Sequence, residues 1–175
     1  MPLRHNLLAL AIATVWGLTF VSIKLALVIV PPFALSGWRF FMAAVPLVFF
    51  VGRPQVPWRW LGIYAVFIAV GQFAVMFIAL NMGMPAGLMS LVVQTQVFFT
   101  IGLAVALFGE SVLRNQIAGA LVATIGLVII GVSKLQGGVG AAFLLVLLAA
   151  FFWAAGNTVA KHVARIARGG RVSAM

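Results

Sequence analysis

Apolar residues run along this chain in six long stretches, which short breaks rich in proline, glycine or polar residues separate. Each stretch is long enough for a membrane-spanning helix, since about 20 apolar residues cross the hydrocarbon core of a bilayer. The expected helices are Leu7–Val30, Phe33–Val51, Trp60–Asn81, Pro85–Phe108, Gln116–Val132 and Gly140–Lys161. Breaks as short as Pro31-Pro32 or "NMGMPAG" at 81–87 force neighbouring helices to run antiparallel. The pattern therefore predicts an all-α, polytopic membrane bundle of about six helices.

The composition points to the same class of protein. Hydrophobic residues make up 65% of the chain and charged residues 7%, with a mean hydropathy of +1.26. A water-soluble chain of 175 residues has no means of burying so much apolar surface, whereas a bilayer solvates it. The absence of cysteine excludes disulfides and thiolate metal sites, and Glu110 is the single acidic residue.

The distribution of lysine and arginine predicts the orientation in the membrane, because cytoplasmic loops carry an excess of both. If the N-terminus is cytoplasmic, eight of the 11 basic residues lie at or near the cytoplasmic side: Arg4, Arg53, Arg59, Arg114, Lys161, Arg165, Arg168 and Arg171. Lys24, Arg39 and Lys134 fall on the other side. The net charge of +10 is thus explained mainly by the basic residues that set the orientation in the membrane. The basic residues are scattered among loops, so nucleic acid is not an expected partner.

Two nonapeptides indicate an internal repeat. "WGLTFVSIK" at 16–24 is echoed by "WAAGNTVAK" at 153–161, with tryptophan and lysine eight residues apart in both. The offset of 137 residues accommodates five helices, and a unit with an odd number of helices enters the membrane from the opposite side when repeated. The sixth helix is then the inverted counterpart of the first. A chance match between two hydrophobic helices is the alternative.

Four motifs carry a family resemblance that covers essentially the whole chain. They are "VWGLTFVSIK" at 15–24, "GWRFFMAAVPL" at 37–47, "GMPAGLMSLVVQTQVFFT" at 83–100 and "FGE" at 108–110. Together they resemble the EamA family of the drug/metabolite transporter superfamily. The resemblance implies ten helices in two inverted five-helix repeats. On that pattern, residues 1–135 form one repeat, and residues 136–175 contribute the first helix of a second, followed by a basic tail, "GGRVSAM", that looks like the approach to a seventh span.

The resemblance also implies a function. It predicts the N-terminal portion of an inner-membrane transporter, with a cytoplasmic N-terminus, that exports amino acids or related small metabolites by alternating access. The expected partners are an amino-acid-like solute, the lipid bilayer and a second half. Two alternatives remain open. One is a non-transporting fragment or membrane assembly subunit. The other is a homodimeric exporter of the small multidrug-resistance kind, whose copies must insert in opposite orientations; the basic bias disfavours it.

Two cations inside the predicted spans are the first candidate substrate-binding residues. Lys24 lies six residues before Val30, roughly 9 Å of helix from the end of its span, and Arg39 lies at a similar depth in the next helix. No acidic residue shares this depth, so the carboxylate of an anionic or zwitterionic solute is a suitable partner for either cation. The alternative is that both side chains extend to the membrane surface.

An aromatic residue and three amides complete the candidate binding set. Trp16 lies about 80° from Lys24 around the helix and can form a wall of the same cavity, or pack between helices. Gln72, Gln94 and Asn157 are mid-span amides that suit either solute contact or hydrogen bonds between helices. Gln94 and Gln96 point about 200° apart, so only one of them can face a given cavity.

Small residues recur at helical spacing in two spans, and this pattern predicts close packing within the repeat or between repeats. The stripes are Gly102, Ala106 and Gly109 in one span, and Gly119, Ala123 and Gly126 in the next. Chemistry beyond transport finds no support in the sequence. Glu110 is alone beside Arg114, which suggests a helix cap or a loop salt bridge. The two histidines lack metal-site spacing, and no phosphate-binding glycine loop is present. We therefore expect neither an enzyme nor a cofactor or metal.

Overall fold

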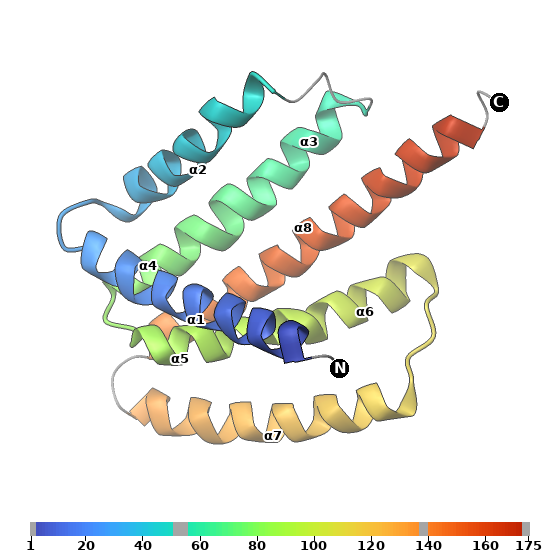
Figure 1. Ribbon diagram of the computed structural model, residues 1–175. Coiled ribbons are helices and arrows are strands. Elements are labelled where there is room, and N and C mark those ends of the chain that lie inside the picture. Colours follow the sequence, from blue (N-terminus) through green and yellow to red (C-terminus); the bar gives the residue numbers. More distant parts are fainter. Residues whose placement is uncertain (1–2, 51–55, 137–139, 173–175) are drawn as a thin grey trace.

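A computed structural model describes residues 3–50, 56–136 and 140–172 of the chain. Six continuous helical segments make up this part: α1 (Leu3–Ala26), α2 (Pro32–Val48), α3 (Trp58–Ala65) continuing through the π-helical η1 (Val66–Ala74) into α4 (Val75–Asn81), α5 (Ala86–Val92) continuing through the 3₁₀ turn η2 (Val93–Thr95) into α6 (Gln96–Phe108), α7 (Arg114–Gln136) and α8 (Gly140–Val172). Consecutive segments run in opposite directions (Figure 1). The all-helical bundle predicted from the hydrophobic pattern is confirmed.

Two helix ends differ from the sequence prediction. The helix expected to reach Val30 ends at Ala26, and the chain continues in a turn in which the Val30 amide donates to the Ala26 carbonyl at 2.9 Å. The cause is the Pro31-Pro32 pair, because a proline disfavours helical geometry in the residue before it. At the other end, α8 extends to Val172 rather than stopping at Lys161, so part of the expected tail is helical. The expected end at Val51 lies outside the described residues.

Within the described residues, length and composition make four of the helices candidates for crossing a membrane. They are Arg4–Ala26, Trp58–Asn81, Ala86–Phe108 and Gly140–Ile166, and two shorter apolar helices cover Pro32–Val48 and Arg114–Ile130. Large apolar side chains point outward along them; Leu10 and Ile12, for example, are 65% and 67% exposed. So large an apolar surface is unfavourable in water and favourable in lipid. The chain is a multi-pass membrane protein.

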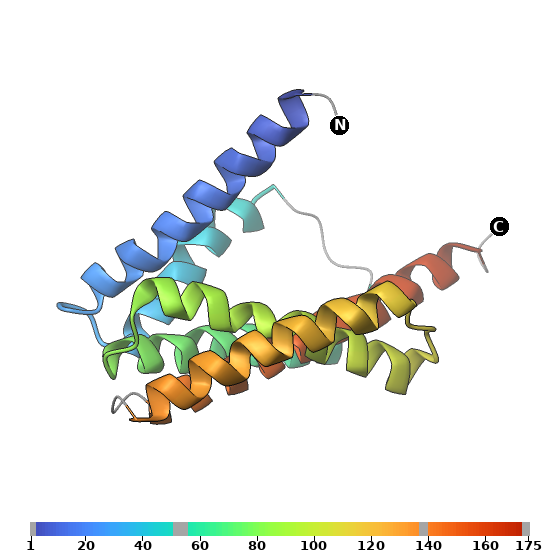
Figure 2. The ribbon, with the colours of Figure 1, turned by 90° about the horizontal axis from the view of Figure 1, so that it is seen from below.

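Helix α8 lies at the centre of the bundle, in contact with α6, with η1 and with α4. Helix α1 runs in the opposite direction to α8 and packs on α5 and α4 through its C-terminal half, while its N-terminal half diverges from the other helices (Figure 2). One end of the bundle is therefore more tightly packed than the other.

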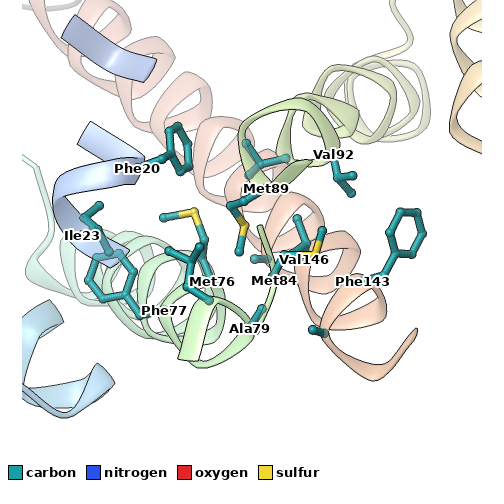
Figure 3. Packing of buried hydrophobic residues seen from close by; sticks show 14 of the residues in the cluster. Phe20, Ile23, Met76, Phe77, Ala79, Met84, Met89, Val92, Phe143 and Val146 are labelled. Carbon is teal, nitrogen blue, oxygen red and sulfur yellow. The ribbon is translucent and has the colours of Figure 1, made fainter. Parts of the chain in front are cut away.

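The hydrophobic core sits at the tightly packed end, where α1 and α4 finish and α5 and α8 begin. Figure 3 shows the side chains that meet there from these four helices. Phe77, Met89 and Val146 are fully buried, and Phe20 and Ile23 close the cluster from α1. The methionines suit this position because an unbranched thioether fills irregular gaps between helices.

Helix α8 packs closely on η1 through two glycines. A Cβ atom on Gly71 would lie 2.5 Å from Cγ of Phe152, and one on Gly156 would lie 2.5 Å from Cδ1 of Ile68. Each glycine thus accepts a large side chain from the other helix, and the two contacts interlock the pair. The sequence prediction placed close packing elsewhere and missed both residues.

The small-residue stripes do not pack closely within the described part of the chain. Gly102, Gly119 and Gly126 have no atom of another residue within 4 Å of a Cβ position, apart from the neighbours in their own helix. Gly109 has φ of +64° and ends α6 as a left-handed cap, a conformation that glycine adopts without strain. Two hollows of about 320 and 270 Å³ separate α7 from the continuous segment of α5, η2 and α6. The prediction that these stripes pack closely within the repeat was therefore wrong. Close packing between repeats stays a prediction.

Candidate functional site

A hollow of about 160 Å³ lies inside the bundle beside the hydrophobic core. Helices α1, α2, η1, α4 and α8 all contribute to its lining: Trp16, Thr19, Phe20, Ile23, Arg39, Gln72, Phe73, Met76 and Trp153. Three of the residues predicted from the sequence, Trp16, Arg39 and Gln72, thus come together from three different helical segments. We call this hollow the central pocket.

The two tryptophans of the repeated nonapeptide face each other in the central pocket. The rings of Trp16 and Trp153 are 5.9 Å apart and nearly perpendicular, an edge-to-face pair. Such pairs contribute about 0.5–1.5 kcal/mol beyond the area that they bury. Trp16 also contacts Phe20 in its own helix. The wall of the pocket between α1 and α8 is therefore aromatic.

Arg39 supplies the positive charge of the central pocket. Its guanidinium lies 4.3 Å from the centre of the Phe73 ring, a cation–π contact that orients it. No carboxylate within the described residues pairs with it. A second hollow, of about 480 Å³ between α1 and α2, shares Thr19, Ile23 and Arg39 with the central pocket. Arg39 is exposed and stands where the central pocket meets a larger lateral hollow.

Gln72 brings an amide to the same pocket from the π-helical segment η1. It is only 3% exposed. The wider turn of a π-helix changes the direction in which the following side chains point, and such segments are frequent at functional sites. A hydrogen bond holds this segment in place, because the buried hydroxyl of Ser36 donates to the Ala69 carbonyl at 3.1 Å. The same bond ties η1 to α2, which carries Arg39.

The structure places the remaining candidates elsewhere. Lys24 is in the last turn of α1 and exposed, where a cation interacts favourably with the helix dipole, and it does not line the central pocket. Gln94, in η2, lines the 270 Å³ hollow that faces α7. The Asn157 amide donates to Oε1 of Gln96 at 3.4 Å, and the Thr100 hydroxyl donates to the same oxygen. The expected divergence of Gln94 and Gln96 is confirmed.

Glu110 forms an ion-pair cluster at the opposite end of the bundle from Lys24. Its carboxylate accepts hydrogen bonds from Lys161 and from Arg165, the latter at 3.2 Å. Both cations also lie over the ring of Phe108. The hydrogen bond from Lys161 lowers the pKa of Glu110, and the positive charges of Lys161 and Arg165 act in the same direction. The expected loop salt bridge is confirmed, but its partners come from α8.

The sequence prediction missed several residues of the central pocket. Trp153 was noticed only as the partner of Trp16 in the repeat, and Phe73 was not considered. The repeat itself was the available signal: if α8 is the counterpart of α1, its tryptophan belongs to the same site. The pocket combines a cation, an amide and aromatic walls, which suits a small zwitterion or anion. In the part of the chain that the structure describes, no group of histidine and acidic residues is placed to hold a metal.

Comparison with known proteins shows the family of the chain. Residues 3–132 match the EamA-like transporter family. The chain belongs to this family. It is 45% identical over 165 residues to a protein of Salmonella typhimurium (strain LT2) and 46% identical over 165 residues to one of Escherichia coli (strain K12), each named "Probable amino-acid metabolite efflux pump". Both alignments cover 93% of this chain and 55% of the relative. No solved structure matches the chain significantly.

Proposed function

We propose that this EamA-family chain is the N-terminal portion of an exporter of amino acids or related small metabolites, and that the central pocket holds the solute. The chain spans about half the length of its curated relatives. The observation that carries the proposal is that Arg39 and Gln72 line the same pocket as the tryptophan pair. The solute carboxylate binds the guanidinium, the amide of Gln72 orients the polar end, and the indoles exclude water.

The dimensions of the pocket support a small solute. Pockets for drug-sized ligands run roughly 300–1,000 Å³, whereas the central pocket measures about 160 Å³. Guanidinium–carboxylate hydrogen bonds are charge-assisted, and they are strong where water is excluded. Alternating access requires the bundle to rearrange around the bound solute. The π-helical segment and the less tightly packed end of the bundle are places where it can do so.

The orientation in the proposal is the one that the basic residues predict. The N-terminus and the Glu110 cluster face the cytoplasm, and the end of the bundle that holds the hydrophobic core lies at the opposite face of the inner membrane. Arg4, Arg59 and Arg114 then lie on the cytoplasmic side. Arg53 lies outside the described residues. The division into a repeat at 1–135 and the first helix of a second at 136–175 remains part of the proposal.

Efflux from reconstituted vesicles tests the proposal and separates it from the alternatives. Two proteins are compared: the 175-residue chain alone, and a chimera in which it replaces the aligned part of the Escherichia coli relative. Activity of the chimera alone supports an N-terminal portion. Activity of the isolated chain supports the homodimer instead. If neither protein shows efflux although both insert correctly, the result supports a non-transporting subunit and contradicts the proposal.

A matched pair of variants in the active protein tests the pocket itself. Arg39→Gln removes the cation of the central pocket and should abolish most of the efflux. Arg59→Gln makes the same chemical change in α3, where the guanidinium lies beside Trp60 and outside the pocket, and should leave efflux close to normal. Equal efflux by the two variants, at equal protein levels, would remove Arg39 from the site.

A further inference from the structure

Lys24 and Lys161 occupy equivalent positions of the repeat but have different surroundings. The two differ by 161 − 24 = 137 residues, the same offset as 153 − 16 for the tryptophans. Lys161 binds the carboxylate of Glu110. Lys24 has no such partner, because Glu110 is the single acidic residue of the chain and its carboxylate is already bound by Lys161 and Arg165.

The tryptophan pair fits an approximate two-fold relation between the two copies of the repeat. When a two-fold axis exchanges two elements, residues close to the axis contact their own counterparts. Trp16 and Trp153 are such counterparts, and their rings are in contact. Helices α1 and α8 also run in opposite directions (Figures 1 and 2), as exchange about an axis in the membrane plane requires.

Applying this operation to the Glu110 cluster gives a specific result. Glu110 follows Gly109, the left-handed residue that ends α6, and from there it reaches across to α8. Its image is an acidic residue just after the end of the fourth helix of a second, inverted repeat, and from there it reaches across to α1. Lys24, exposed in the last turn of α1 at the other end of the bundle, is the image of Lys161.

We propose that the Lys24 end of α1 is an interaction surface for an inverted second repeat, and that Lys24 forms an ion pair there with the acidic residue 137 positions after Glu110. The curated relatives supply the length that this partner needs, since 45% of each lies outside the aligned region. Each repeat then binds the first helix of the other through one carboxylate, at opposite faces of the membrane. Lys24 is thereby an assembly residue rather than a ligand of the solute.

Site-directed cross-linking in the chimera with the Escherichia coli relative tests the pairing. This chain has no cysteine, so each introduced pair can be followed alone once native cysteines of the other part are replaced. Lys24→Cys is combined with cysteine at the acidic counterpart and treated with a short bis-maleimide. The pair Lys161→Cys with Glu110→Cys is the positive control, and Ser22→Cys, exposed on another face of α1, is the negative control.

We expect Lys24→Cys to cross-link with a yield comparable to the positive control and well above Ser22→Cys. A yield no higher than that of Ser22→Cys overturns the proposal, as does a relative with no acidic residue at the counterpart position. Where the chimera does not insert, the same pairs are placed in the unmodified Escherichia coli relative.

Charge reversal supplies an independent test. Lys24→Glu should lower the thermal midpoint of the chimera, and placing lysine at the acidic counterpart should restore it, whereas Glu110→Lys should not. Failure of the swap to restore the midpoint contradicts the pairing. Neither readout requires transport. A chimera that cross-links but moves no solute supports the ion pair and contradicts the proposed function. An active chimera without the cross-link supports the proposed function and contradicts the ion pair.

Discussion

Substituting alanine for Gly71 should loosen the contact between η1 and α8 that holds the central pocket together. The new Cβ would lie 2.5 Å from Cγ and 2.8 Å from Cδ1 of Phe152. Carbon atoms pack best about 3.5–4.0 Å apart, so the ring must retreat by about 1 Å. Overpacking of this kind costs typically 1–3 kcal/mol. The expected loss in free energy of unfolding is therefore about 2 kcal/mol before any gain in helix propensity.

Gly102→Ala is the matched control for this substitution. It makes the same chemical change inside a helix, but no atom of another helix lies within 4 Å of the new Cβ. The helix-propensity gain of up to about 1 kcal/mol is common to both variants and cancels in the comparison. Unfolding is followed by circular dichroism during titration of lipid–detergent micelles with a denaturing detergent.

A double-mutant cycle locates the strain. Combining Gly71→Ala with Phe152→Ala removes the ring that the new methyl group meets, so the cost of Gly71→Ala should nearly vanish in that background. If Gly71→Ala is as stable as Gly102→Ala, or if its cost is unchanged without the ring, the proposed interlock of η1 and α8 is refuted.

Three further predictions concern polar contacts between segments. Glu110→Gln should lower the thermal midpoint at neutral pH. The folded-state pKa of Glu110 lies below its ordinary value of 4.5, so this stabilisation is present above pH 4.5 and is lost as the pH falls through the folded pKa. The melting curves of wild type and variant should therefore converge in acid, and an equal difference at every pH would contradict the ion pair. Asn157→Ala should cost about 0.6 kcal/mol, the usual size of a hydrogen bond between membrane helices, and a cycle with Gln96→Ala that shows no coupling would disprove the bond. Ser36→Ala should cost a similar, roughly 0.6 kcal/mol and speed hydrogen exchange in η1; unchanged exchange would show that the bond to Ala69 does not hold this segment.

Much of the fold could be predicted from the sequence because membrane helices must satisfy their own backbone groups. Apolar length and the Pro31-Pro32 break fixed the number of helices and their antiparallel order. The early end of α1 was predictable in principle from the same prolines. The extension of α8 to Val172 was not, because "IARGGRV" at 166–172 has neither the apolar length nor the propensity of a strong helix.

Prediction of the site reached as far as the separate helices allowed. Arg39 and Gln72 were chosen as polar residues inside predicted spans, and Trp16 as a cavity wall beside Lys24. The first three line one pocket, but Lys24 does not, so the shared cavity of Trp16 and Lys24 was wrong. Their convergence depends on tertiary packing, which spacing within one helix cannot encode. The π-helical segment turns the face that carries Gln72, and no sequence periodicity signals it. Gly71 was missed for a related reason, because the residue that it makes room for, Phe152, is 81 residues further along the chain.

Binding of paired ligands tests the central claim, that Arg39 in the central pocket recognises a carboxylate. Small amino acids and the amines that lack only their carboxylate are titrated into the purified chimera, with tryptophan fluorescence as the readout, because Trp16 and Trp153 line the pocket. A hydrogen-bonded charge contributes about 1.5–3 kcal/mol, so an amino acid should bind roughly 10- to 150-fold more tightly than its amine. Arg39→Gln should erase this preference. Equal affinity of the unmodified protein for both ligands, or a preference that survives Arg39→Gln, would contradict the account.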